Sequence, residues 1–179
     1  MRPAPLVVLC LALLGCGEPG DAAYAGWTEL RADSGAYRML FLDPPWDLLE
    51  TSGNESLLEI PSVASKVAPS ELPAYALEVT VASGAAEPSI ARERRRAISR
   101  AEEVIADIAP FETESGDRGF QLFTRDTDDR LRHHRYVFVD RPGGGAVSLH
   151  FDANPSLMDR EVDVMIASVE VDPPRGDRP

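Results

Sequence analysis

Apolar and polar residues alternate in several short segments of this chain, a pattern typical of β-strands with one buried face. The clearest example is residues 75–81, where Tyr75, Leu77, Val79 and Val81 occupy every second position. Residues 37–42 and 57–60 are two further strand candidates, and prolines that cannot continue a strand ladder follow both. Residues 61–73 are rich in proline and serine and predict a loop.

The middle of the chain shows a different period. After Pro88-Ser89, apolar side chains recur at the three- and four-residue spacing of an α-helix. They are Ala97, Ile98, Ala101, Val104, Ile105 and Ile108. We therefore predict one helix from Pro88 to about Ala109, with this apolar stripe against a sheet.

The last third predicts a three-stranded meander followed by a helix. The strands are residues 119–127, 131–140 and 145–152, separated by turns rich in Asp, Pro and Gly. Residues 136–139 are apolar on both faces, which predicts a strand covered on both sides. Asn154-Pro155 then has the composition of a helix start, and Met158, Val162, Met165, Ile166 and Val169 form its apolar stripe.

This order of elements predicts one α+β domain over residues 37–172. Short connections make the sheet antiparallel, and the amphipathic helices predict an α/β/α sandwich with helices on both faces. Phe138 and Ile166 should be buried in it, and residues 173–179 should be a disordered tail.

The N-terminus has the pattern of a secretory signal peptide. Arg2 precedes an apolar run from Leu6 to Leu14, which is too short to span a bilayer. Residues 1–15 would be removed, and residues 16–36 would form a flexible tether. In this tether Trp27 would either dock on the domain or rest at the membrane interface.

The end of this signal, Leu13-Leu14-Gly15-Cys16, resembles the lipobox of bacterial lipoproteins. The resemblance implies that Cys16 becomes the N-terminus and carries a thioether-linked diacylglycerol and an N-acyl chain such as palmitate. Gly17 in place of Asp implies an outer-membrane destination on the periplasmic face. The alternative is an ordinary signal peptide cut near Ala22-Ala23.

Composition limits the classes of molecule that this protein is expected to bind. The chain has a net charge of −12, which excludes nucleic acid as a favoured partner and disfavours direct binding to anionic lipid. Both cysteines, Cys10 and Cys16, lie in or at the signal, so the domain has neither a disulfide nor a thiolate metal site.

One polar constellation follows from the last hairpin. If this hairpin is symmetric about Gly143, Tyr136 opposes His150 and His134 opposes Asp152, so these four side chains share one face. His134, His150 and Asp152 are then candidate ligands for a divalent metal. The favoured interpretation is a polar cross-strand cluster without metal, and we expect no cofactor.

A second constellation is cationic. Arg92, Arg95, Arg96 and Arg100 fall near one face of the predicted helix. This ridge would bind an acidic envelope protein or anionic lipid head groups. The alternative is that these arginines pair with Glu87, Glu93 and Glu102 and bind nothing.

Two stretches resemble PsbP-like domains: YRMLFLDPPW from residue 37, and AVSLHFDANPSLMDREVDVMIASVEV from residue 146. The resemblance implies an antiparallel sheet between helices and a non-enzymatic binding or assembly factor. No functional residue of that family maps onto this chain.

No hydrolase, phosphate-binding or dinucleotide motif is present in the sequence. We therefore expect a membrane-anchored envelope lipoprotein that acts as a non-catalytic binding or assembly module. A periplasmic carrier of a small ligand or metal, and a hydrolase with an unrecognised site, remain the alternatives.

Overall fold

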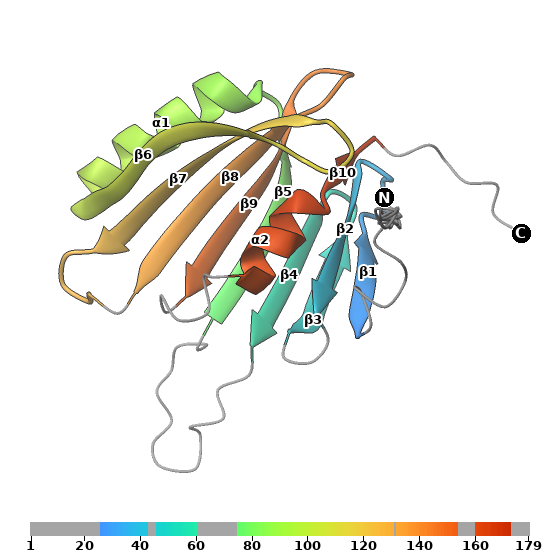
Figure 1. Ribbon diagram of the computed structural model, residues 1–179, viewed down its shortest axis with the longest axis horizontal. Coiled ribbons are helices and arrows are strands. Elements are labelled where there is room, and N and C mark those ends of the chain that lie inside the picture. The colour runs from blue at the N-terminus through green and yellow to red at the C-terminus, as the bar shows by residue number, and fades with distance from the viewer. Residues whose placement is uncertain (1–25, 43–45, 61–74, 131, 154–159, 173–179) are drawn as a thin grey trace, which may run out of the picture.

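The computed structural model describes residues 26–42, 46–60, 75–130, 132–153 and 160–172 (Figure 1). Their elements run β1 (Trp27–Arg31), β2 (Tyr37–Leu42), β3 (Asp47–Ser52), β4 (Glu55–Ile60), β5 (Tyr75–Ala82), α1 (Ala86–Ser99), β6 (Glu102–Glu112), β7 (Arg118–Asp126), β8 (His133–Asp140), β9 (Ala146–Ala153), α2 (Arg160–Ala167) and β10 (Glu170–Val171). The predictions of a signal peptide, of a lipidated Cys16, of a loop at 61–73, of a helix start at Asn154-Pro155 and of a tail at 173–179 concern residues outside the described ranges.

The strands form two antiparallel sheets. The larger has seven strands in the order β3-β4-β5-β9-β8-β7-β6, and the smaller has three in the order β1-β2-β10. The α+β class, the antiparallel sheet and the meander of β7, β8 and β9 are therefore confirmed. The smaller sheet was not predicted.

Alternate side chains of β8 enter two separate apolar clusters. Val137 and Val139 pack in the cluster that contains the buried residues of α2, Val162, Met165 and Ile166. Tyr136 and Phe138 pack with Ala86 and Ile90 of α1 in the other. β8 is thus buried on both faces, as its sequence predicts.

The cluster on the α2 side is the larger and includes the three-stranded sheet. Tyr37, Met39 and Phe41, which alternate along β2, are all buried in it. Trp46 packs edge-on against Phe151 of β9, with ring centroids 6.4 Å apart. Over its described residues, Arg160–Ala167, α2 covers only part of this side, and β1 and β2 supply much of the rest of the cover.

The tether predicted for residues 16–36 requires a correction, because β1 occupies Trp27–Arg31. Leu30 and Ala32 are buried, and Trp27 packs against the same cluster. Trp27 therefore docks on the domain, and residues 27–36 belong to the fold. The backbone of β1 pairs with β2 along its whole length, but Leu30 is its one buried residue, so no alternation in its sequence marks it as a strand.

The long helix predicted for residues 88–109 is wrong in its second half. α1 ends at Ser99, Ala101 takes the left-handed conformation at φ 62°, and the chain reverses into β6. Ile98 and Ile105, expected against the sheet, are about half exposed. Val104 and Ile108 do pack inward, and their spacing of four residues fits a strand as well as a helix.

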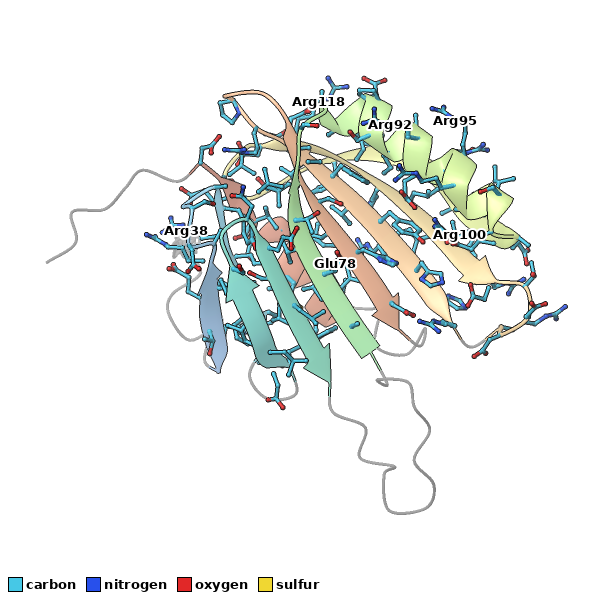
Figure 2. All side chains as sticks on the ribbon, turned by 180° about the vertical axis from the view of Figure 1, so that it is seen from behind. Arg38, Glu78, Arg92, Arg95, Arg100 and Arg118 are labelled. Atoms are coloured by element: carbon cyan, nitrogen blue, oxygen red, sulfur yellow. The ribbon has the colours of Figure 1, made fainter. Side chains whose placement is uncertain are left out.

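α1 packs over β6, β7 and β8, and the neighbouring face of β5 and β4 has no helix over it (Figure 2). This arrangement leaves a hollow beside the helix, with a floor of sheet side chains. Neither helix in the described part of the chain is long and apolar enough to cross a membrane.

Candidate binding groove

The hollow beside α1 has a volume of about 670 Å³ and a strongly polar lining, and we call it the α1 groove. Its walls come from α1 and the turn into β6, and its floor from β5, β9 and β8. The lining residues are Glu78, Thr80, Ala82, Glu93, Arg96, Arg100, Glu102, Asp126, Arg132, His134, Tyr136, Phe138, Ser148, His150 and Asp152. A hollow of this size is within the usual range of small-ligand sites.

The predicted register of the last hairpin is confirmed. Tyr136 opposes His150, and His134 opposes Asp152. All four residues line the groove, because strand positions two apart share a face. The Tyr136 and His150 rings stack with centroids 4.5 Å apart.

The two imidazoles belong to one polar chain. His150 Nε2 lies 3.3 Å from His134 Nδ1, and His134 Nε2 lies 3.1 Å from Asp126 Oδ1. Burial and the nearby His134 together lower the pKa of His150 to about 4. His150 is therefore neutral at pH 7, and its Nε2 is committed to the second ring.

Glu102 is the most enclosed acid of the groove, with 3% of its side chain exposed. Its carboxylate accepts hydrogen bonds from Thr124 Oγ1 and, at 2.7 Å, from Arg100 Nε. Burial would raise the pKa of Glu102, but the bonds from Thr124 and Arg100 outweigh it and hold the pKa below its ordinary value. The Tyr136 hydroxyl lies 3.3 Å from the same carboxylate. Sequence reasoning missed Glu102 because it placed this residue on the outside of a helix.

The predicted metal ligands are neighbours, but their arrangement is not that of a free ligand set. His134 Nδ1 lies 3.9 Å from Asp152 Oδ1, and both Asp152 oxygens lie 2.9 Å from Arg132 Nε. Among the described residues, the atoms that converge within 4.8 Å belong to Glu102, Asp126 and His134. Arg100 and Thr124 already bond to the two oxygens of Glu102, and a cation at that point would compete with them.

Two of the four arginines of the predicted ridge line the groove, and two do not. Arg92 and Arg95 are exposed and point away from the sheet, whereas Arg100 points toward it (Figure 2). Arg96 and Arg100 line the groove instead. All four side chains are exposed, and the partner-binding role of the ridge stays a prediction.

The two arginines that line the groove have acidic partners. Arg96 Nη1 lies 3.3 Å from Glu93, and Arg100 Nη2 lies 2.9 Å from the same carboxylate. Arg100 Nη2 also donates to the Tyr136 hydroxyl at 2.8 Å. Pairing with Glu93 and Glu102, the alternative raised from the sequence, thus holds for Arg96 and Arg100.

Comparison with known proteins identifies the fold. No family model matches the sequence, and no curated protein matches it. The structure is similar to the solution structure of cyanobacterial PsbP (CyanoP) from Synechocystis sp. PCC 6803, with a TM-score of 0.56 and 13% sequence identity. The match covers 87% of this chain and 98% of that protein. The chain therefore has a PsbP-like fold, as the resemblance of its two stretches implied.

Proposed function

We propose that this protein is a non-catalytic binding module of a bacterial cell envelope, that it is anchored by lipid on Cys16, and that it binds its ligand in the α1 groove. The observation that carries the proposal is the groove itself, a polar hollow of about 670 Å³ on the face of the sheet that α1 leaves uncovered. In this proposal the domain is a PsbP-like α/β/α sandwich, and one of its helices forms a wall of the binding site.

The internal contacts of the groove favour binding over catalysis. An acyl-transfer site needs a nucleophile whose hydroxyl is within reach of a free base. Ser148 lies on the floor, but the nearest imidazole along its strand, His150, directs Nε2 at His134. The acids of the groove wall, Glu93 and Glu102, are held in ion pairs. Such preset charges suit recognition of a ligand with a fixed charge pattern.

The anchor rests on the lipobox resemblance of Leu13-Leu14-Gly15-Cys16. Several acyl chains give stable membrane attachment, whereas a single chain gives only marginal attachment. We expect wild-type protein to fractionate with outer membranes and to carry the mass of a lipid, and Cys16→Ser to lose both. A mature wild-type protein that begins beyond Cys16 and carries no lipid would contradict this part of the proposal.

Photo-cross-linking in cells tests the binding site. Positions 95 and 96 are neighbours on α1 and are both exposed, but only position 96 lines the groove, so a photoreactive amino acid is placed at each in turn. We expect a discrete adduct, of small mass for a small ligand or of protein mass for a partner, from position 96 and not from position 95. Equal adducts from both positions, or none from position 96, would contradict the proposal.

A further inference from the structure

The floor of the α1 groove contains polar groups that no internal contact uses. Thr80 opposes Ser148 across the β5–β9 pair, and Glu78 opposes His150. Among the described residues, the side chains of Glu78, Thr80 and Ser148 have no hydrogen bond or ion pair. One carboxylate and two hydroxyls therefore face the hollow from adjacent strands.

The remaining charges of the groove neutralise each other only in part. Its lining has five carboxylates and three guanidinium groups. Arg96 and Arg100 are taken up by Glu93 and Glu102, and Arg132 by Asp152. The groove is thus negative overall, and Glu78 holds a negative charge that no cation of the lining offsets.

The geometry keeps the lining cations away from Glu78. Arg100 bonds to the hydroxyl of Tyr136 on β8, and β9 separates β8 from β5. Two strand spacings place Glu78 about 10 Å from Tyr136 across the sheet. Figure 2 shows Glu78 on the part of β5 that α1 does not cover.

A second hollow adds to the negative potential at this point. It has a volume of about 340 Å³, and Glu78 lines both hollows. Glu55 of β4 lines the second hollow. Leu57 lies directly opposite Glu78 on β4, so Glu55, two residues before Leu57, lies diagonally across from Glu78. Two hollows therefore meet at one carboxylate, with a second carboxylate beside it.

We propose that the floor of the α1 groove binds a primary ammonium or guanidinium group, with Glu78 as its counter-charge and the hydroxyl oxygens of Thr80 and Ser148 as further acceptors. This inference rests on the proposed function, because it names the ligand class of the same groove. A hydrogen bond from a cationic donor to a carboxylate is roughly twice as strong as a neutral one. The group can belong to a free organic amine or to a Lys or Arg side chain of a partner peptide.

Isothermal titration calorimetry of the full-length lipidated protein in detergent tests the charge preference. The probes are butylguanidinium, butylammonium and butyrate, which share a short alkyl chain, at up to about 10 mM, the range expected for so few atoms. We expect both cations to bind, with weaker binding at high salt, and butyrate not to bind. Binding of butyrate as tight as that of the cations, or no binding of either cation, would overturn the inference.

Matched variants test the assigned carboxylate. Glu78→Gln keeps the shape and removes the charge, and we expect about ten-fold weaker binding of butylguanidinium, or more. Glu112→Gln removes an exposed carboxylate outside the groove and should bind like wild type. Equal affinity of wild type and Glu78→Gln would overturn the assignment.

A peptide series separates the two sources of the cation. If the acetylated tripeptide Gly-Arg-Gly amide binds at least ten-fold tighter than butylguanidinium, and its citrulline analogue does not, the group belongs to a partner peptide. Affinity no better than that of butylguanidinium assigns the site to free amines, and both results support the inference.

The two proposals can fail separately. If neither cation binds while the position-96 adduct persists, the ligand class is wrong and the binding function stands. If both fail, the proposed function fails too.

Discussion

The Nε atom of Arg100 lies 2.7 Å from Oε1 of Glu102, and this ion pair spans the reversal between α1 and β6. Ala101 lies between the two residues in the left-handed conformation. The same Arg100 also donates to the hydroxyl of Tyr136 on β8, in the seven-stranded sheet that includes β6. The pair therefore fixes the end of the helix against the sheet and shapes one wall of the α1 groove.

Removing the acid of this pair should destabilise the domain. Glu102→Ala leaves the buried Thr124 hydroxyl and one edge of Arg100 without an acceptor, so we expect a loss of about 2 kcal/mol in the free energy of unfolding. The control is Glu103→Ala, which removes an exposed partner of Arg125 and should cost less than about 1 kcal/mol. Urea denaturation of both variants measures the difference, and equal losses would contradict the assigned role of Glu102.

Truncation of either apolar cluster should also be costly. Phe138 and Ile166 were expected to be buried, and they are 8% and 3% exposed in two different clusters. We expect Phe138→Ala and Ile166→Ala each to lower the free energy of unfolding by about 2–5 kcal/mol. Their effects should add in the double variant, because the two residues belong to separate clusters. A wild-type denaturation midpoint for either single variant would contradict the burial of that residue.

Acid should weaken the fold through His150. Burial and the nearby His134 lower its pKa to about 4 from an unfolded value of 6.5, although Asp152, Glu93 and Glu102 oppose the shift. The unfolded chain therefore binds more protons between these two values, and this residue's contribution to stability falls as pH drops from about 6.5 to about 4. The expected loss is on the order of a few kcal/mol.

The control for this pH dependence is His150→Gln, which keeps a polar side chain without a titrating ring. Thermal melts of wild type and variant between pH 7 and pH 4 should show a smaller acid loss in the variant. Parallel loss of melting temperature in both proteins would mean that other groups carry the acid sensitivity.

Zinc is not expected to stabilise the protein. The convergent atoms of Glu102, Asp126 and His134 already have protein partners, including Arg100 on Glu102. We therefore expect micromolar Zn²⁺ to leave the melting temperature of wild type unchanged. A saturable rise that His134→Ala removes would show instead that this cluster is a metal site.

Strands were predicted correctly where the alternation of apolar residues in the sequence agrees with the contacts in the structure. Residues 75–81 alternate strictly, and β5 forms there between β4 and β9. The symmetric turn at Gly143 fixed the register of β8 and β9, and with it the positions of His134 and His150 on one face. This part of the groove was therefore predictable from the symmetry of the turn together with two-residue periodicity.

The rest depended on contacts between segments distant in sequence. Residues 102–112 match a helix in their apolar spacing, and only pairing with β7 makes them a strand. The helix was wrongly predicted to continue past Ser99, and this error concealed that Glu102 lies in the groove. It also concealed that only some of the arginines line the groove. β10 has only two residues, so no periodicity exists that could reveal its pairing with Tyr37 and Arg38.

The most direct test of the groove is the yield of the cross-link from position 96 with and without Ser148→Trp. Ser148 lies on the floor, where an indole would fill space needed by a ligand without touching α1's outer face. Thr28→Trp, at an exposed position of β1, is the matched control, and thermal melts confirm that both variants fold. We predict that Ser148→Trp abolishes the adduct and that Thr28→Trp leaves it intact. An undiminished adduct in a folded Ser148→Trp protein would contradict the assignment of binding to this groove.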